Sequence, residues 1–295
     1  MKFNFLIIFF LLINISAKAQ DDCGSINSYL VFDAKNRDIL SEEFSDKILY
    51  PASLTKLMTL YLTFEALEKK EIKLSDEIIV SPRVSEVSNI NKITTLKLQE
   101  GDKLTVEQAI KAVIIKSMNG AAVALAEKVA ENEWAFTHKM NEKAFKLAMY
   151  NTSFRNSTGL HEDGQYTTAH DLARLVIALR RDFIKYYPLF SLKEFEYGDK
   201  KFITHNNILL QYDGAEGIKT GFTSVAGYNL ISAASKNNER IISIVMGCKT
   251  LEARDNLSKE LLDRGFVNIE NENKNFISKV STSFDYQIPY VMKDF

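Results

Sequence analysis

A serine and a lysine stand three residues apart at Ser53 and Lys56, just after Pro51. A serine hydroxyl is a weak nucleophile until a neighbouring base removes its proton. Residues three apart on a helix share a face, and a lysine becomes a base when burial or a nearby cation lowers its pKa. The pair therefore predicts acyl transfer through Ser53, whose backbone N–H at a helix start would face a developing oxyanion. Alone, Ser-x-x-Lys also fits a plain helix turn.

Two further short motifs carry groups that such a reaction needs. Ser117-Met118-Asn119 interrupts a helical stretch, where the serine can relay a proton and the asparagine amide can bind a peptide group. Lys219, Thr220 and Gly221 lie on a predicted strand, to which an extended peptide can add as another strand. The lysine offers positive charge, the threonine a hydroxyl for a carboxylate, and the glycine removes bulk where the strand approaches a helix. Taken singly, these motifs also fit a helix cap and an ordinary strand.

The elements around the motifs follow an α+β pattern. Strand patterns occupy 28–33, 38–40, 217–222, 228–234 and 240–247. Helical periodicity and capping signals predict helices over 51–69, 105–116, 121–129, 134–150, 168–181 and 253–264. Residues 73–104 are predicted to form loops and short strands. Strands near both chain ends with helices between them predict a sheet closed by the two termini.

Composition is that of an ordinary globular protein. The 295 residues are 46% apolar and 25% charged, with a net charge of −1, which gives no reason to expect a nucleic acid as a partner. None of the four histidines stands at metal-ligand spacing, so the sequence assigns no metal and no cofactor. The histidines are predicted to be surface or hydrogen-bonding residues: His138, His161, His170 and His205.

Residues 1–19 have the pattern of a secretory signal. A basic start at Lys2, an apolar run over 3–15 and the small residues of 17–19 predict cleavage after Ala19. The apolar run is short for a membrane span, and an uncleaved anchor is the alternative. An export signal places the mature chain in an oxidising space, where Cys23 and Cys248 could pair or remain two unrelated thiols.

Together, the three motifs resemble those of the low-molecular-mass penicillin-binding proteins, the D-alanyl-D-alanine carboxypeptidase family. The resemblance covers roughly residues 26–266 and includes the segments 51–59, 152–156, 159–160, 167–171, 216–223 and 226–230. It implies a five-stranded antiparallel sheet of the β-lactamase and transpeptidase type, formed by both chain ends with a helical subdomain inserted. It also implies a catalytic domain over 20–266 and a short tail over 267–295 without a separate domain.

The resemblance implies a role for each matching position. Ser53 would be acylated, Lys56 would be its base, Ser117 would relay the proton and Asn119 would hold the acyl-side peptide. On the other side of the site, the resemblance assigns the carboxylate region to Lys219 and Thr220, with Gly221 next to them in the substrate-binding strand. It assigns the oxyanion hole to the backbone N–H groups of Ser53 and Phe222, and help in binding the carboxylate to Arg254.

Two features depart from the family pattern. Gly120 follows the middle motif where the family usually has aspartate, which puts one supporting contact in doubt. Many relatives also carry a C-terminal β domain and an amphipathic anchor, and 275–295 shows no strong apolar stripe, so the sequence predicts neither. In this fold the first strand lies antiparallel to the last, and Cys23 and Cys248 flank those strand ends. The resemblance thus favours a disulfide between them.

The implied activity is that of a serine carboxypeptidase in the periplasm or cell-wall space. It would remove the terminal D-alanine of peptidoglycan stem peptides that end in D-Ala-D-Ala, and β-lactam antibiotics would acylate it. One alternative is a D,D-endopeptidase of the same family. Another is a β-lactamase, for whose deacylating glutamate Glu162 is the candidate on a plausible loop. A third is a non-catalytic wall-binding protein on the same fold.

Overall fold

The computed structural model describes residues 28–90 and 97–285, and side chains as far as residue 271. The predicted signal peptide and Cys23 lie outside the described residues. Within this part of the chain, no helix combines the length and apolarity needed to cross a membrane.

The centre of the molecule is a five-stranded antiparallel sheet with the order β2-β1-β9-β8-β7. Its strands are β1 (Ser28–Asp33), β2 (Ile39–Glu43), β7 (Ala215–Thr223), β8 (Gly227–Lys236) and β9 (Glu239–Cys248). The predicted pairing of the first strand with the last is confirmed, since Ser28 lies opposite Met246 in the β1–β9 register. The expected fold class is confirmed, and β7 lies at one edge of the sheet with its outer side unpaired within the sheet.

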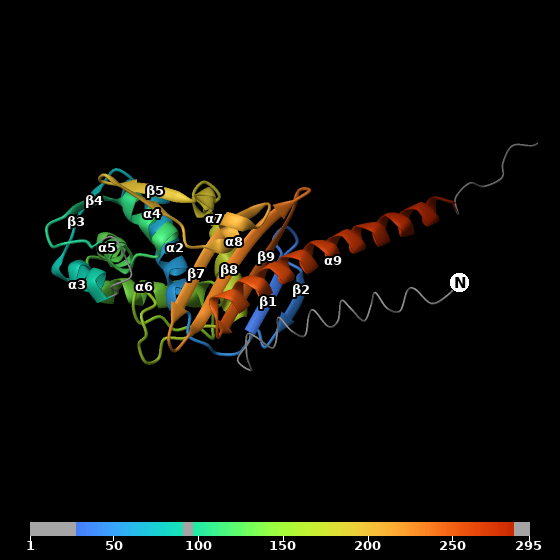
Figure 1. Cartoon of the computed structure of the whole chain (residues 1–295), viewed down its shortest axis with the longest axis horizontal. Coiled ribbons are helices and arrows are strands. Elements are labelled where there is room, and N and C mark those ends of the chain that lie inside the picture. The colour runs from blue at the N-terminus through green and yellow to red at the C-terminus, as the bar shows by residue number, and fades with distance from the viewer. Residues whose placement is uncertain (1–27, 91–96, 286–295) are drawn as a thin grey trace, which may run out of the picture.

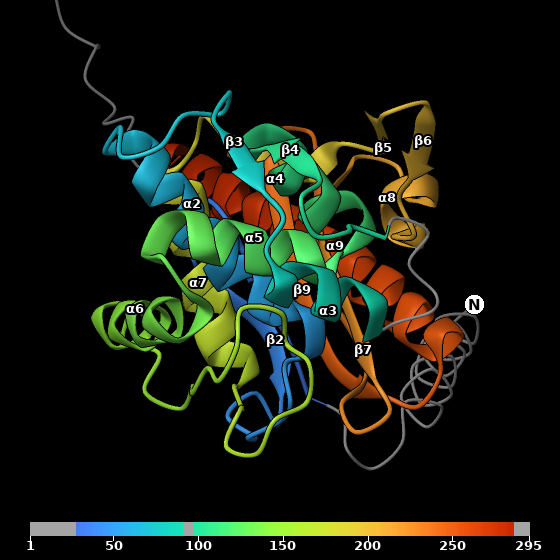
Figure 2. The same cartoon turned by 90° about the vertical axis from the view of Figure 1, so that its left-hand side faces the viewer.

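Helices cover both faces of this sheet. On one face lies α9 (Leu251–Asp285), which packs on β9, β8 and β1 and continues beyond the sheet (Figure 1). The helical subdomain covers the other face, and α7 (Ala169–Asp182) packs there against β1 and β9 (Figure 2). The buried positions of α7 recur on one side, as expected for a helix with one face in the core.

The rest of the subdomain surrounds one buried helix. The alanine-rich α5 (Asn119–Ala130) packs against α2 (Lys56–Glu68), α3 (Pro82–Ile90), α4 (Val106–Lys116) and α6 (Glu133–Lys146). Small side chains let these four neighbours approach closely. The remaining helical elements are short: η1 (Ala52–Thr55), η2 (Tyr187–Ser191) and α8 (Asn207–Gln211). Two small two-stranded sheets complete the described part of the chain. One pairs β3 (Glu77–Ile79) with β4 (Lys103–Thr105), and the other pairs β5 (Glu194–Tyr197) with β6 (Lys200–Ile203).

Two predictions about the helices are wrong. Helix α3 lies within 73–104, where only loops and short strands were expected. The helix was missed because only two of its side chains, Val84 and Val87, join the apolar core, which is too few to give a helical pattern. The last helix does not end at Arg264 but continues to Asp285. Gly265 resembles a helix stop, yet its role is packing, since a Cβ there would lie 2.8 Å from Ile241 of β9.

The strand ends place one of the two cysteines as expected. Cys248 ends β9, is fully buried and is disulfide-bonded. Its expected partner, Cys23, lies outside the described residues, so the pairing between these two stays a prediction.

An aromatic cluster ties α2 to the segment after α7. Phe64 of α2 has no exposed surface and stacks on Tyr186 with ring centroids 4.9 Å apart. Its ring also meets Phe183 and Phe190 edge to face, at 5.9 and 6.3 Å. Because α2 carries Lys56, this cluster also holds the candidate site in place.

We expect Phe64→Ala to lower the free energy of unfolding by about 3–5 kcal/mol, since a buried ring is lost and a cavity remains. Phe64→Leu should cost less. Phe145→Ala removes a ring that is 71% exposed and should have almost no effect. Chemical denaturation of the three variants measures this, and equal midpoints for Phe64→Ala and Phe145→Ala would contradict it.

Candidate active site

Ser53 lies on a tight turn that feeds directly into α2. The 3-10 segment η1 precedes Lys56, and in such a helix residues three apart eclipse one another. Ala52, before the serine, has a φ of 49°, a left-handed conformation that is costly for alanine. Gly159 lies against this turn, and a Cβ there would come within 1.8 Å of the Ala52 carbonyl oxygen. The serine therefore sits on a bent backbone that a neighbouring loop supports.

The Lys56 amine contacts three oxygens. Its Nζ lies 2.9 Å from Ser53 Oγ, 2.8 Å from Asn119 Oδ1 and 2.5 Å from the Thr158 carbonyl oxygen. The amide and carbonyl oxygens only accept hydrogen bonds. A neutral amine would donate its two hydrogens to them and keep its lone pair for the Ser53 hydroxyl. The geometry is thus that of a base aimed at a nucleophile.

Electrostatics favour the neutral form of this amine. Burial lowers the pKa of Lys56 well below its usual value, and the positive charge of Lys219 lowers it further. Lys56 has no exposed surface. A buried lysine beside a second cation is the environment in which a lysine acts as a general base.

The second motif lies beside the third. Ser117 ends α4 with a φ of 56°, in a left-handed turn between α4 and α5. Lys219 Nζ donates to Ser117 Oγ at 2.8 Å and to the Thr220 carbonyl oxygen at 2.9 Å. Burial lowers the pKa of Lys219 to about 7, and the charge of Arg254 contributes to this. Six of the predicted residues are thus joined by hydrogen bonds into two groups: Ser53, Lys56 and Asn119 form one, and Ser117, Lys219 and Thr220 form the other. The positive charge of Lys219 also acts on Lys56.

Strand β7 passes close to the nucleophile turn. A Cβ on Gly221 would lie 3.2 Å from the Ser53 backbone nitrogen, tighter than ordinary contacts, so glycine allows the close approach that was expected. The next residue, Phe222, is 53% exposed and packs its ring against Tyr228. Because β7 is an edge strand, its outer backbone groups can pair with an extended peptide beside Ser53.

Arg254 is buried near the Lys219 side of the site. It is 2% exposed, and its guanidinium binds Asp255 Oδ1 at 2.6 and 2.9 Å. Its charge lowers the pKa values of both Lys219 and His205. The arginine therefore adds positive charge to the region that was expected to bind a carboxylate.

Two residues near the site had no assigned role in the sequence. Asn229 of β8 has no exposed surface, donates to the carbonyl oxygens of Tyr50 and Pro51 at 3.0 and 3.1 Å, and accepts from the Gly247 N–H at 2.8 Å. It ties the backbone before Ser53 to the sheet. His205, predicted to be a surface or hydrogen-bonding histidine, forms a hydrogen bond with Thr220. The only sequence signal for Asn229 was its place in the matching segment 226–230, and His205 had none.

Glu162, the candidate glutamate of the β-lactamase alternative, is part of a loop network. Its carboxylate accepts from Asn156 Nδ2 at 3.0 Å. The same asparagine side chain accepts from the Gly159 N–H at 2.8 Å, so the pair shapes the loop that presents the Thr158 carbonyl oxygen to Lys56.

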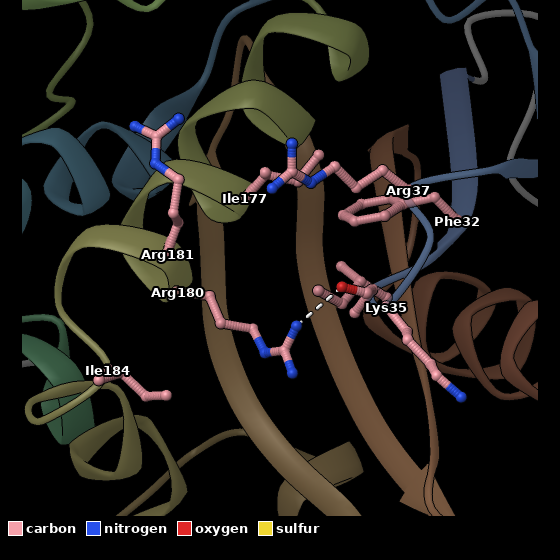
Figure 3. Close-up of a pocket in the computed structure, with 9 residues that line it drawn as sticks. Phe32, Lys35, Arg37, Ile177, Arg180, Arg181 and Ile184 are labelled. Carbon is pink, nitrogen blue, oxygen red and sulfur yellow. Dashed lines mark hydrogen bonds between the residues drawn. The ribbon is translucent and has the colours of Figure 1, made fainter.

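A separate hollow of about 250 Å³ lies between the end of α7 and the β1–β2 turn (Figure 3). Arg180 projects into it and donates to the Ala34 carbonyl oxygen at 2.7 Å. Lys35 at its rim pairs with Glu239 at 3.7 Å. Its lining contains no serine, threonine or cysteine, so it is not the candidate active site.

Gly120 shows why the family's usual aspartate is absent. It starts α5 beside α3, and a Cβ there would lie 1.8 Å from Ser88 Oγ and 3.1 Å from the Val84 carbonyl oxygen. The Ser88 hydroxyl, which donates to that carbonyl at 2.8 Å, occupies the space that a larger residue would need. A larger residue at 120 would therefore have to displace Ser88, while Asn119 and Ser117 keep their contacts with Lys56 and Lys219.

Comparisons with known proteins agree with this geometry. A family model described as D-alanyl-D-alanine carboxypeptidase matches residues 15–250. The D-alanyl-D-alanine carboxypeptidase DacF of Bacillus subtilis is 36% identical over 275 residues, which cover 86% of this chain and 67% of DacF. DacC of Escherichia coli is 37% identical over 242 residues, covering 81% of this chain and 60% of DacC. The chain thus spans about two thirds or less of the length of these relatives.

Solved structures show the same fold. Penicillin binding protein 5 from Haemophilus influenzae aligns with a TM-score of 0.77 and 34% identity, over 81% of this chain and 70% of that one. Penicillin-binding protein D2 from Listeria monocytogenes, in its ampicillin-bound form, aligns with a TM-score of 0.72 and 29% identity, over 81% and 96% of the two chains.

We expect Gly120→Ala to lower the free energy of unfolding by about 1–3 kcal/mol, because the new methyl group overpacks the α3–α5 contact. Adding Ser88→Ala removes the oxygen that it would strike and should recover more than half of this loss. Thermal denaturation of both variants and of Ser88→Ala alone measures the effect. A Gly120→Ala protein as stable as the parent would contradict the packing explanation.

Proposed function

The chain belongs to the D-alanyl-D-alanine carboxypeptidase family, and on that premise we propose that it is a serine carboxypeptidase acting on peptidoglycan stem peptides that end in D-Ala-D-Ala. The observation that carries the proposal is the Lys56 amine, held 2.9 Å from Ser53 Oγ by two oxygens that can only accept hydrogen bonds. This pair stands beside an edge strand that can bind an extended peptide.

The first half of the reaction forms an acyl-enzyme. Lys56 takes the Ser53 proton as the hydroxyl oxygen attacks the carbonyl carbon of the penultimate D-alanine. Backbone N–H groups of Ser53 and Phe222 would stabilise the oxyanion, as in the family's pattern. The C–N bond then breaks, and Lys56 passes the proton it took from Ser53 through Ser117 to the nitrogen of the departing D-alanine.

The second half releases the shortened peptide. A water molecule gives a proton to Lys56 and attacks the carbonyl carbon of the Ser53 ester. The ester C–O bond breaks, and Lys56 returns the proton to the Ser53 oxygen. Lys219 and Thr220 would bind the terminal carboxylate of the substrate, with Arg254 adding positive charge to that region. A β-lactam carries a carboxylate beside a strained amide, so it would acylate Ser53 and, without a leaving group that departs, stay bound.

The proposal places the mature enzyme in the periplasm or cell-wall space. Support comes from the signal pattern of residues 1–19 and from the location of the substrate itself. We assign the catalytic domain to residues 20–266.

We expect a fluorescent penicillin to form a stable adduct with the mature protein and none with Ser53→Ala. Intact-mass analysis measures the adduct, and Ser75→Ala, which removes an exposed serine, is the matched control. The protein should also release D-alanine from a peptide ending in D-Ala-D-Ala faster than it cleaves a cross-linked dimer of stem peptides.

Other outcomes point to the alternatives. Faster cleavage of the cross-link would favour the D,D-endopeptidase. Rapid loss of penicillin without an adduct would favour a β-lactamase. Neither adduct nor turnover, with stem peptide still bound, would leave a wall-binding protein.

We expect kcat/KM for D-alanine release to have a bell-shaped pH profile. The acid limb arises because the lowered pKa of Lys56 leaves its amine neutral above that pKa, and the base is lost as pH falls through it. The alkaline limb arises because Lys219 has a pKa of about 7 and loses its charge as pH rises past that value.

The variant Lys219→Arg tests the assignment of the alkaline limb. A guanidinium stays charged throughout this range, so the remaining activity should show no alkaline limb near pH 7. Lys116→Arg, at the end of α4, is the control and should keep the parent profile. An unchanged alkaline limb in Lys219→Arg would contradict the role of Lys219.

A further inference from the structure

We propose that His205 is a positioning residue, whose Nε2–H donates to Thr220 Oγ1 and so directs the Thr220 hydroxyl proton to the terminal carboxylate of the substrate. The inference rests on the proposed function, because it concerns how that site recognises a free carboxylate. Its ligand class is a peptide or β-lactam with an ionised carboxylate next to the bond that Ser53 attacks.

The contact between the two side chains is direct. His205 Nε2 lies 2.8 Å from Thr220 Oγ1. Thr220 is 6% exposed and follows Lys219 on the edge strand β7. His205 lies in the connection between β6 and α8, 15 residues before Thr220, and the residue is exposed to solvent. The His205 imidazole thus reaches the Thr220 hydroxyl from the loop between β6 and α8.

The loop that carries His205 is braced on both sides. Before it, the Thr204 N–H donates to the Lys193 carbonyl oxygen at 2.7 Å. After it, Asn206 caps α8, and Asn207 Nδ2 donates to Asp255 Oδ2 at 2.8 Å. Asp255 is also the partner of Arg254. The histidine is therefore held by the same network that holds the buried arginine.

The hydroxyl of Thr220 has one proton to give. A carboxylate only accepts hydrogen bonds, so Thr220 must use that proton when it binds the substrate. The remaining groups on its oxygen are lone pairs, and a neighbour 2.8 Å away must then be a donor. For an imidazole this requires the proton on Nε2 and leaves Nδ1 as the acceptor. The opposite tautomer would take the threonine proton and present lone pairs to the carboxylate.

The surrounding charges keep the imidazole neutral. Partial burial and the charges of four nearby cations together lower the pKa of His205 to about 3, and these cations are Lys219, Lys116, Arg254 and Lys56. A charged residue at this position would add another cation beside Lys219 and depress its pKa again. A neutral imidazole can donate to Thr220 without lowering the pKa of Lys219, so Lys219 keeps its positive charge.

The test compares two substrates that differ only in the carboxylate. We expect His205→Leu to lower kcat/KM about tenfold for a peptide ending in D-Ala-D-Ala, mainly through KM, because one hydrogen bond to a charged group is weakened. Turnover of the C-terminal amide of the same peptide should change less than twofold. His205→Gln, whose side-chain N–H can replace Nε2–H, should recover most of the loss. His138→Leu, an exposed histidine on α6, is the matched control.

A second arm asks whether His205 acts through Thr220. In a Thr220→Val background, which removes the hydroxyl, His205→Leu should have no further effect on kcat/KM. Equal losses for the carboxylate and the amide, or losses that multiply in the double variant, would overturn the inference. Circular dichroism and thermal denaturation of each variant show that it is folded.

Failure of the proposed function gives a different pattern. A parent protein that turns over peptide, with His205→Leu equal to it, overturns only the role of His205. A parent protein that releases no D-alanine and forms no penicillin adduct overturns the function itself. If the parent forms the adduct without releasing D-alanine, the acylation rate by penicillin replaces kcat/KM in the same comparison of variants.

Discussion

The positive charge of Lys219, acting on a second buried lysine, is the constraint on which the rest of the site depends. Both amines are buried, and burial and mutual repulsion together disfavour two charges in one cavity. Lys56 is surrounded by oxygens that accept hydrogen bonds, whereas Lys219 faces a hydroxyl and a carbonyl near Arg254. The proposed roles of Lys56 as base and Lys219 as carboxylate partner rest on this unequal environment, although the two side chains are chemically the same.

Holding such a pair in place requires rigid backbone on every side. The nucleophile turn is fixed from the sheet by the buried amide of Asn229 and from the opposite loop by Gly159, where no side chain fits. Gly221 lets β7 approach the same turn. The two glycines and the asparagine therefore serve one purpose, which is to hold the 156–160 loop and the β7–β8 hairpin against the turn that carries Ser53. Preorganisation of this kind removes the entropy cost of assembling the site during the reaction.

The sequence was a good guide where a local pattern and the final environment agree. Alternating apolar residues predicted β1, and a capping box predicted the start of α4, because each depends on neighbours in sequence. The sequence pattern did not predict α3, because few of its side chains reach the core. It also placed the end of the last helix too early, because Gly265 is a glycine that lets the helix pack closely against Ile241 and is not a helix stop. The three motifs predicted which residues gather at the site. His205 could not be found this way, since its contact with Thr220 exists only once the β6–α8 connection folds against β7.

The carboxylate of the substrate would do more than anchor it. Burial and then the charge of Lys219 lower the pKa of Lys56. An anion bound beside Lys219 would offset part of that charge, so the Lys56 amine would become a stronger base when the substrate binds. The same anion would raise the pKa of Lys219, which burial and the charge of Arg254 lower, and would favour its charged form. Recognition and activation are thus coupled through one set of charges. A substrate without the carboxylate would lose its anchor and also meet a weaker base, so part of its discrimination would fall on kcat as well as on KM.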